Sequence, residues 1–373
     1  MSRRRIRDPI HDLIVFPDDR EGNTLWSLLE TEPVQRLRRI KQLGFSEFVY
    51  PGASHKRLSH SLGAMQMARR MLQSFEKRNA IEDFDAERHA AWSLATLSAA
   101  LVHDIGHGPY SHVFEELSEM QGAKVGHEEY TRLLIENTKI SEILADAGVL
   151  EETMYFFTKE KQSNPYGSII SSQMDCDRLD FLARDRYFTG IRSSVIDLEW
   201  LFDSLSVEKV YTDVIGDAFE YSIVVNKKGK RVIEEFVNSY TKMYKDVYFH
   251  KTTRSMQHLA TFCFKKALEE LDEKEIASDR MLSVFSKLGD GPIDVEKYLT
   301  LDDATFTNAI GFIRELGKGE SAEFATRYLE RKPLKCLDAS SFDISPGKIK
   351  ILRDELNKQK TWFHLDVVKD KGL

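Results

Sequence analysis

Cysteine is scarce in this chain, and a membrane-spanning apolar run is missing. The three cysteines, Cys176, Cys263 and Cys336, form no C-x-x-C pair, so we expect apolar thiols in a reducing compartment rather than disulfides or a zinc site. No stretch reaches the roughly 20 apolar residues that cross a bilayer. The basic start at residues 3–5 is not followed by the apolar segment of a signal peptide. These absences predict a cytoplasmic protein with no membrane partner.

An excess of positive charge is also absent, because 53 basic residues stand against 60 acidic ones for a formal net charge of -7. Binding along nucleic acid depends on neutralising phosphates, so this balance disfavours nucleic acid as the general partner. Basic residues do gather at 3–7 and 36–41, which leaves local contacts open. Charged runs of this kind usually form the solvated face of a helix.

The spacing of apolar residues predicts a mainly α-helical protein. Residues 1–192 read as successive helices that form one body without internal repeats, and residues 193–373 as a further helical region packed on that body rather than separate from it. Tyr211, Phe219 and Tyr221 favour β-structure around a Gly216-Asp217 turn, so we expect a small hairpin or sheet in the C-terminal half. Helices are predicted over 230–270, 302–316 and 321–330.

Histidines are concentrated in one part of the sequence. Six of the eleven lie within residues 60–127, and five of these form the candidate cluster, namely His60, His103, His107, His112 and His127. The apolar run 92–102 predicts a buried helix that ends at His103-Asp104, where Gly106, Gly108 and Pro109 break it. Side chains at the end of a buried helix are well placed to face a cleft. His11, His89, His258 and His364 are interpreted as ordinary hydrogen-bonded histidines.

Two further helices supply a second histidine and a second carboxylate. His60 begins a helix whose apolar stripe includes Ala64, Met67 and Met71, and Asp177 lies on a predicted helix over 173–186. We therefore predict a metal site formed by His60, His103, Asp104 and Asp177. Two imidazoles and two carboxylates suit one divalent ion, such as Mn, Fe, Co, Ni or Zn, with Mg also open.

Longer runs around these residues resemble a known family. They are IRDPIH at 6–11, QRLRRIKQLG at 35–44, PGASHKRLSHSLG at 51–63, LVHDIGHGPYSH at 101–112 and DCDRLDFLARD at 175–185, with a fainter YFHK at 248–251. The chain resembles the HD phosphohydrolases, and specifically the sterile-alpha-motif and HD-domain deoxynucleoside triphosphohydrolases and their bacterial relatives. The resemblance implies an HD-domain helical body and covers about the first two thirds of the chain.

The resemblance also implies roles for individual residues. The four predicted ligands match the family's metal site. Its catalytic acid and base cluster is matched by His107, His112 and Glu115, with His127 in support. Gln42, Leu43 and Tyr248 match positions that contact a deoxyribose, and Asp185 is assigned to the substrate with them. Arg57, Arg178 and Lys251 are the cations expected to reach phosphate groups.

The sequence departs from the family pattern on the phosphate side. Arg178 stands where a Lys is usual, Phe181 where a Tyr is expected, and Tyr240 where an Arg is expected. Arg178 keeps the charge and adds a planar fork. A triphosphate therefore remains the expected substrate, with a diphosphate or monophosphate still open.

The family's guanine-nucleotide activator site has partial counterparts here. Gln35 and Arg38 match base-reading positions, Glu30 stands where the family has Asp, and Arg4 and Arg5 fall near the stretch that faces the activator's phosphates. An Arg fork suits the acceptor edge of guanine. We expect a homo-oligomer, either a dimer or a tetramer.

Three functions stay open from the sequence. The first is a metal-dependent hydrolase that converts deoxynucleoside triphosphates to deoxynucleoside and triphosphate. The second is an HD nuclease or phosphodiesterase acting on nucleic acid or another phosphorylated nucleotide, which the basic N-terminal segment suggests. The third is a nucleotide sensor with weak or no turnover, which is the least favoured because the predicted ligands and His107 are all retained.

Overall fold

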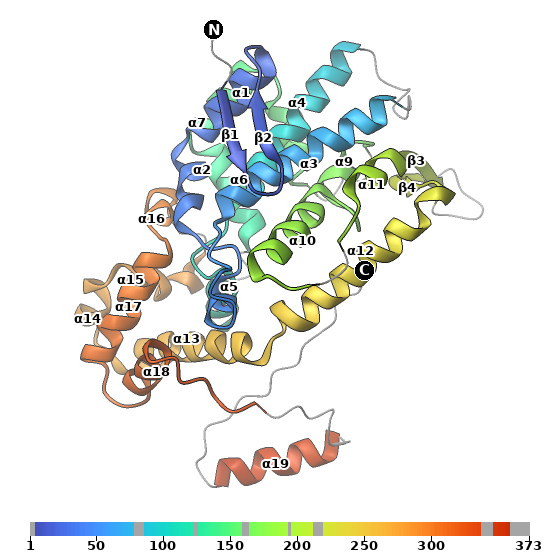
Figure 1. Ribbon diagram of the computed structural model, residues 1–373. Helices are drawn as coiled ribbons and strands as arrows, with labels where there is room; N and C mark the ends of the chain where they lie inside the picture. The colour runs from blue at the N-terminus through green and yellow to red at the C-terminus, as the bar shows by residue number, and fades with distance from the viewer. Residues whose placement is uncertain are drawn as a thin grey trace.

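The computed structural model describes residues 4–77, 86–122, 126–158, 164–192, 195–211, 219–291, 293–336 and 346–358. The predicted mainly α-helical class is confirmed (Figure 1). The helices of the first half are α1 (Arg20–Leu29), α2 (Glu32–Arg36), α3 (Arg57–Lys77), α4 (Ala86–Val102), α5 (Ser111–Met120), α6 (His127–Glu136), α7 (Lys139–Asp146), α8 (Leu150–Tyr155), α9 (Gly167–Ile170) and α10 (Cys176–Thr189). Those that follow are α11 (Leu198–Ser204), α12 (Lys230–Met243), α13 (Lys251–Glu270), α14 (Glu273–Ser278), α15 (Arg280–Phe285), α16 (Val295–Leu299), α17 (Asp303–Leu316), α18 (Glu320–Leu329) and α19 (Pro346–Lys358).

The centre of the helical body is α3, which packs against both α4 and α10 (Figure 1). Its predicted apolar stripe is confirmed, since Ala64, Met67 and Met71 are fully buried. The helix begins at Arg57 rather than at His60, so His60 lies in its first turn. The three helices that carry the predicted metal ligands are thus neighbours in the core.

The N-terminal segment forms a hairpin that the expectation of helices alone did not include. Strand β1 (Arg4–Asp8) pairs antiparallel with β2 (Asp12–Phe16). In the turn, the Asp8 carboxylate accepts from the backbone N–H groups of Ile10 and His11, and Asp12 takes a left-handed φ of 57°. A short side-chain-capped turn of this kind is set by local hydrogen bonds rather than by apolar periodicity.

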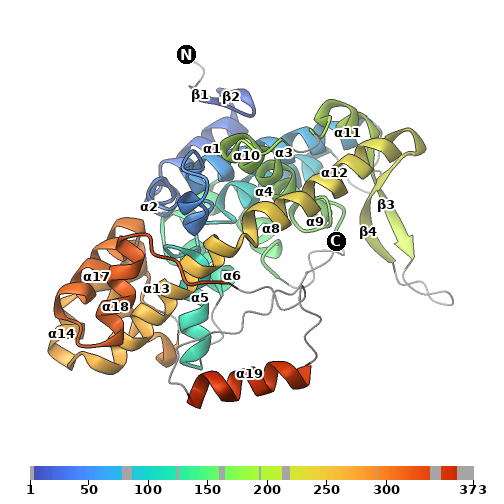
Figure 2. The same ribbon diagram turned by 60° about the horizontal axis from the view of Figure 1, so that its bottom comes forward.

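A second hairpin lies where the sequence predicted one. Strand β3 (Leu205–Tyr211) pairs antiparallel with β4 (Phe219–Val225), while the predicted Gly216-Asp217 turn lies outside the described residues. Figure 2 shows α12 and α13 crossing the body, with this hairpin at one end and α14, α17 and α18 at the other. The division at residue 192 remains a prediction.

The helix predicted over 230–270 is interrupted. Between α12 and α13 the backbone adopts a π-helical turn at Tyr244–Tyr248, and the His250 side chain then caps α13. Tyr240 and Tyr244 stack with ring centroids 4.3 Å apart. The wider turn directs Tyr248 toward α10, where its ring lies 6.1 Å from that of Phe181. Apolar spacing alone does not distinguish such a turn from continuous helix.

Two predictions about the surface have different outcomes. In the described ranges, no helix is both long and apolar enough to cross a membrane. The basic run at 36–41 is only partly a solvated face, because Arg38 and Arg39 are exposed but the Arg36 side chain is fully buried.

Arg36 connects separate parts of the fold. Its guanidinium donates to the backbone oxygens of Leu301, Ile105 and His107 at 2.8, 3.2 and 3.0 Å, and it lies 4.8 Å from the centroid of the Tyr298 ring. Two of these carbonyls belong to the turn that follows His103-Asp104. The C-terminal helices are therefore linked to the turn beside the predicted ligands.

Replacing Arg36 by Met is expected to lower the free energy of unfolding by about 3 kcal/mol, because three buried carbonyls would each lose a charged donor. Thermal and urea unfolding followed by circular dichroism measure the change. The control is Arg38→Met, at an exposed position two residues away, with an expected change within about 0.5 kcal/mol. Equal stability of the two variants would contradict the role given to Arg36.

Candidate metal centre

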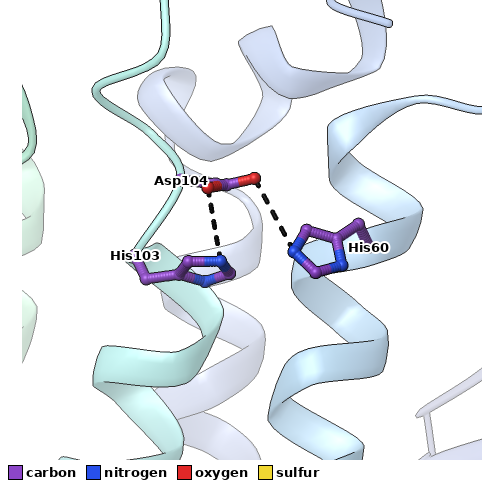
Figure 3. Close-up of side chains that lie close together, drawn as sticks. All are labelled: His60, His103 and Asp104. Atoms are coloured by element: carbon purple, nitrogen blue, oxygen red, sulfur yellow. Dashed lines mark ion pairs between the residues drawn. The ribbon is translucent and has the colours of Figure 1, made fainter. Parts of the chain in front are cut away.

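The structure brings together all four predicted ligands. His60 comes from the first turn of α3, His103 and Asp104 directly follow α4, and Asp177 lies in the first turn of α10. Figure 3 shows the His60 and His103 rings on neighbouring helices, both turned toward the Asp104 carboxylate. Packing of three core helices therefore creates a cluster from segments far apart in the sequence.

The distances within this cluster suit one small cation. His60 Nε2 lies 2.9 Å from Asp177 Oδ1 and 3.8 Å from Asp104 Oδ2. His103 Nε2 lies 3.3 Å from Asp104 Oδ1 and 3.8 Å from Asp177 Oδ1. Ligand atoms of His60, His103 and Asp104 all lie within 4.8 Å of one another.

Both rings are held so that Nε2 faces the cluster. His103 Nδ1 lies 2.8 Å from the Ala100 backbone oxygen, which only accepts, so Nδ1 carries the proton. His60 Nδ1 lies 2.8 Å from Asp180 Oδ2. Among the described residues, His103 Nε2 is buried without a hydrogen-bond partner. A buried imidazole lone pair aimed at two carboxylates fits a divalent cation.

The pKa values of the clustered residues indicate which positive charge a bound cation would replace. Burial alone would lower the pKa of His60, but Asp177, Asp180 and Asp104 together raise it to about 10. Against the same effect of burial, Asp104 and Asp177 raise the pKa of His103. Burial opposes ionisation of Asp104, yet Arg57 and the histidines hold its pKa well below the usual range. Without metal, a proton on His60 supplies positive charge that the carboxylates require.

A second histidine cluster adjoins the first. His107 Nε2 lies 3.2 Å from Asp104 Oδ1, and its ring stacks on His127 with centroids 4.0 Å apart. His127 Nδ1 in turn lies 2.7 Å from Glu115 Oε1. Burial, with Arg57 and His127 nearby, lowers the pKa of His107 to about 3, so this ring is neutral. The predicted acid and base residue His112 has a side chain outside the described set.

The three predicted phosphate-binding cations have different environments. Arg57 Nη1 donates to Asp104 Oδ2 at 2.6 Å and Nη2 to Ser111 Oγ at 3.3 Å, so Arg57 holds a candidate ligand in place. Arg178 donates to the Asp175 carboxylate and the Ser172 backbone oxygen. Lys251 is exposed at the start of α13.

The residues predicted to contact a sugar include a connected group. The Tyr248 hydroxyl donates to Asp185 Oδ2 at 2.7 Å, and His55 Nε2 lies 2.8 Å from Asp185 Oδ1. Gln42 Oε1 is buried and, among the described residues, has no hydrogen-bond partner. Leu43 is half-buried. His55 was not among the predicted site residues.

The residues predicted to bind an activator form two small groups. In the first, the Arg4 guanidinium lies 5.3 Å from the centroid of the Trp26 ring, and the Trp26 indole donates to Glu30 Oε1 at 2.7 Å. In the second, Arg38 Nε donates to Gln35 Oε1 at 2.7 Å. Arg5 is an exposed residue of β1. Their role as a nucleotide site remains a prediction.

Sequence reasoning did not assign a role to the residues that support His60. Asp180 and Arg184 lie on the same helix as Asp177, and no function was predicted for either of them. His11 was interpreted as an ordinary hydrogen-bonded histidine, and it is hydrogen-bonded, but to Asp180. The spacing of Asp177 and Asp180 by three residues on one helix was the available signal.

A cavity of about 230 Å³ lies apart from this cluster. It is lined by another face of α10, including Leu182 and Arg186, with Pro9 and Ile10 from the β1–β2 turn. None of the four candidate ligands lines it.

Comparison with known proteins gives a family match over this part of the chain. The model described as HD domain matches residues 57–182, a segment that contains all four candidate ligands. The YwfO protein of Bacillus subtilis is 33% identical over 301 residues, covering 80% of this chain and 63% of that protein. A Dictyostelium discoideum protein named as a homolog of the deoxynucleoside triphosphate triphosphohydrolase SAMHD1 is 27% identical, covering 81% of this chain and 54% of its own length.

A solved structure extends the similarity to nearly the whole chain. A phosphohydrolase from Bacteroides thetaiotaomicron aligns with a TM-score of 0.74 at 26% identity, covering 96% of this chain and 84% of that one. The chain thus spans under two thirds of the length of the two sequence relatives above.

Metal affinity should depend on pH. At neutral pH the metal-free protein holds a proton on His60, because the pKa of that ring is about 10. A cation that takes Nε2 must displace this proton, so the dissociation constant for Mn²⁺ should fall about tenfold for each pH unit raised from 6 to 8. Calorimetric titration in buffers with different ionisation enthalpies measures both affinity and proton release. An affinity independent of pH, with no proton released, would contradict this assignment.

Proposed function

Because this chain belongs to the HD-domain phosphohydrolase superfamily, we propose that it is a metal-dependent hydrolase of deoxynucleoside triphosphates. The products are the deoxynucleoside and inorganic triphosphate. The observation that carries the proposal is the convergence of His60, His103, Asp104 and Asp177, with the His107, Glu115 and His127 cluster directly beside them. The choice of substrate is supported by similarity to the SAMHD1 homolog, which is named as a deoxynucleoside triphosphate triphosphohydrolase.

His60 and His103 would hold the cation together with the carboxylates of Asp104 and Asp177. A bound divalent ion lowers the pKa of a water ligand and offsets negative charge on a phosphoryl oxygen. Arg57 keeps Asp104 ionised and correctly oriented, through the 2.6 Å hydrogen bond to Oδ2. The protein thereby fixes the charges before substrate binds, which is the main requirement of phosphoryl transfer.

The adjoining cluster handles the proton of the leaving oxygen. His107 is neutral and half-buried, with Nε2 beside the Asp104 carboxylate as a hydrogen-bond donor, so it positions that group rather than delivering a proton. His127 is more exposed and has Glu115 behind its Nδ1, so Glu115 can accept from the ring while Nε2 transfers a proton. Imidazole suits this task because it can both take up and release a proton in general acid–base catalysis. His112 is assigned to the same cluster by its position in the sequence.

Arg178 and Lys251 are assigned to the phosphate chain. Arg178 follows Asp177 and is oriented by Asp175, so its fork presents a fixed charge next to the metal centre. Lys251 lies three residues after Tyr248 at the exposed start of α13. Arg178 and Phe181 are departures from the family pattern, and a rearranged set of phosphate contacts is part of the proposal.

Tyr248, Asp185, Gln42 and Leu43 are assigned to the sugar. The Tyr248 ring is fixed by Phe181 on one side and by the hydrogen bond to Asp185 on the other. A rigid ring of this kind excludes an added hydroxyl by steric contact. We further propose that the Arg4, Arg5, Glu30, Gln35 and Arg38 region binds a guanine nucleotide in a homo-oligomer.

The activity test is product analysis by ion-exchange chromatography. Purified protein with Mn²⁺ is expected to release inorganic triphosphate from deoxynucleoside triphosphates, with and without guanosine triphosphate. His103→Ala should lower the rate at least about 100-fold, because a candidate ligand is lost. His89→Ala, a histidine outside the cluster, serves as the control.

Each other outcome of this experiment points to a different function. Release of orthophosphate alone would contradict the proposed bond cleavage. Cleavage of single-stranded nucleic acid that depends on His103 would assign a nuclease, and nucleotide binding without turnover under several metals would assign a sensor.

Two substitutions of Tyr248 separate its ring from its hydroxyl. Tyr248→Ala should shift the ratio of kcat/KM for a ribonucleotide over its deoxy counterpart upward by about tenfold, because the steric barrier is removed. Tyr248→Phe keeps the ring but leaves Asp185 Oδ2 without its donor, so kcat/KM should fall for both nucleotides while their ratio is unchanged. Steady-state kinetics with dGTP and GTP measure the ratio. A ratio that does not change in Tyr248→Ala would remove Tyr248 from sugar selection.

A further inference from the structure

We infer that the turn of the N-terminal β1–β2 hairpin is a structural part of the metal centre, with His11 and Asp8 as positioning residues for His60. The inference rests on the proposed metal site but not on the identity of the substrate. Two hydrogen-bonded routes lead from this turn to His60, and both pass through the Asp180 carboxylate.

The first route is direct. His11 Nε2 lies 2.7 Å from Asp180 Oδ1, and Asp180 Oδ2 lies 2.8 Å from His60 Nδ1. The side chains of His11 and Asp180 are 2% and 0% exposed, so water does not compete for these bonds. A single carboxylate therefore joins a histidine of the hairpin turn to a candidate ligand 49 positions later in the sequence.

The second route runs through Arg184. Its guanidinium donates to Asp180 through Nε at 2.8 Å and Nη2 at 3.0 Å, and to Asp8 through Nη1 at 2.8 Å and Nη2 at 3.2 Å. Asp8 also accepts from the backbone of the turn. Arg184 is fully buried, so its charge is balanced by these two carboxylates rather than by solvent.

The orientation of the Asp180 carboxylate is fixed by its hydrogen bonds. Each of its oxygens accepts two hydrogen bonds, Oδ1 from His11 and Arg184, and Oδ2 from His60 and Arg184. Loss of the His11 donor would leave a buried lone pair unsatisfied and allow the carboxylate to rotate away from His60. The orientation of the His60 ring, and with it the direction of Nε2, then depends on a residue outside the segment 57–182 that matches the HD-domain model.

The packing of α3 provides independent support. A Cβ added at Gly63, one turn after His60, would lie 1.9 Å from Asp180 Oδ1 and 2.4 Å from Arg184 Nη2. A glycine inside a long helix costs about 1 kcal/mol relative to alanine. At position 63, however, the absence of a Cβ leaves room for the Asp180 carboxylate and the Arg184 guanidinium, which carry the two routes.

A two-stranded hairpin is marginal alone, and the buried Asp8–Arg184 and His11–Asp180 contacts attach this one to α10. Displacement of the hairpin therefore disorients His60. Whatever moves the N-terminal segment in the folded protein would change metal affinity without contacting a ligand residue.

The test compares amides of different reach at position 11. The amide nitrogen of His11→Gln can occupy the place of imidazole Nε2, whereas that of His11→Asn is too short to reach Asp180. The readout is the Mn²⁺ dissociation constant of the full chain, measured by competition with a fluorescent chelator at a temperature where circular dichroism shows folded protein. His11→Asn is expected to bind Mn²⁺ about 10- to 100-fold more weakly than wild type, and His11→Gln to recover most of this loss. His89→Asn, which removes a histidine paired with Glu76 away from the cluster, is the matched control.

The outcomes are decisive and separate from the hydrolase proposal. Wild-type affinity in folded His11→Asn, or an equal loss in His89→Asn, would overturn the inference. Should His11→Asn not fold, Asp8→Asn carries the decision, since weaker binding supports the second route and unchanged binding overturns it. Metal affinity is measured without substrate, so absence of nucleotide hydrolysis would overturn the proposed function while leaving this result intact.

Discussion

The candidate metal centre depends on two imidazole rings that are each held by a contact at Nδ1, so that Nε2 faces the carboxylates. For His103 the acceptor on Nδ1 is a carbonyl of its own helix, the Ala100 oxygen. For His60 it is the Asp180 carboxylate from another helix. The first arrangement depends only on the local end of α4, whereas the second requires α3, α10 and the N-terminal hairpin to pack correctly.

Charge balance is the second constraint on this region. Burying Asp104, Asp180 and Asp185 near one another is unfavourable unless each is compensated. Arg57 compensates Asp104, Arg184 compensates Asp180, and Asp185 is held by hydrogen bonds from Tyr248 and His55. Asp177 instead lies against the two imidazoles. The negative charge of Asp177 therefore marks the position where a bound cation would be stabilised most.

The sequence predicted the helical body and the four clustered residues because their signals are local. The buried helix before His103, the apolar stripe after His60 and the β-favouring run near 219–225 each follow from side-chain periodicity. What could not be predicted depends on contacts between distant segments or on turn chemistry. The Asp8-capped hairpin, the burial of Arg36 against carbonyls of two separate segments, and the attachment of His11 to Asp180 all belong to this group. The roles of the individual site residues remain predictions.

The π-helical turn at Tyr244–Tyr248 contains one residue more than an α-helix needs for the same advance. Each residue of an α-helix rotates the chain by about 100°. Deleting a single residue here would restore regular winding and turn α13, with everything attached to it, relative to α12. The length of this short segment, more than its composition, therefore sets the rotational phase between the helices on either side of it, so homologous chains should tolerate substitutions here more readily than insertions or deletions.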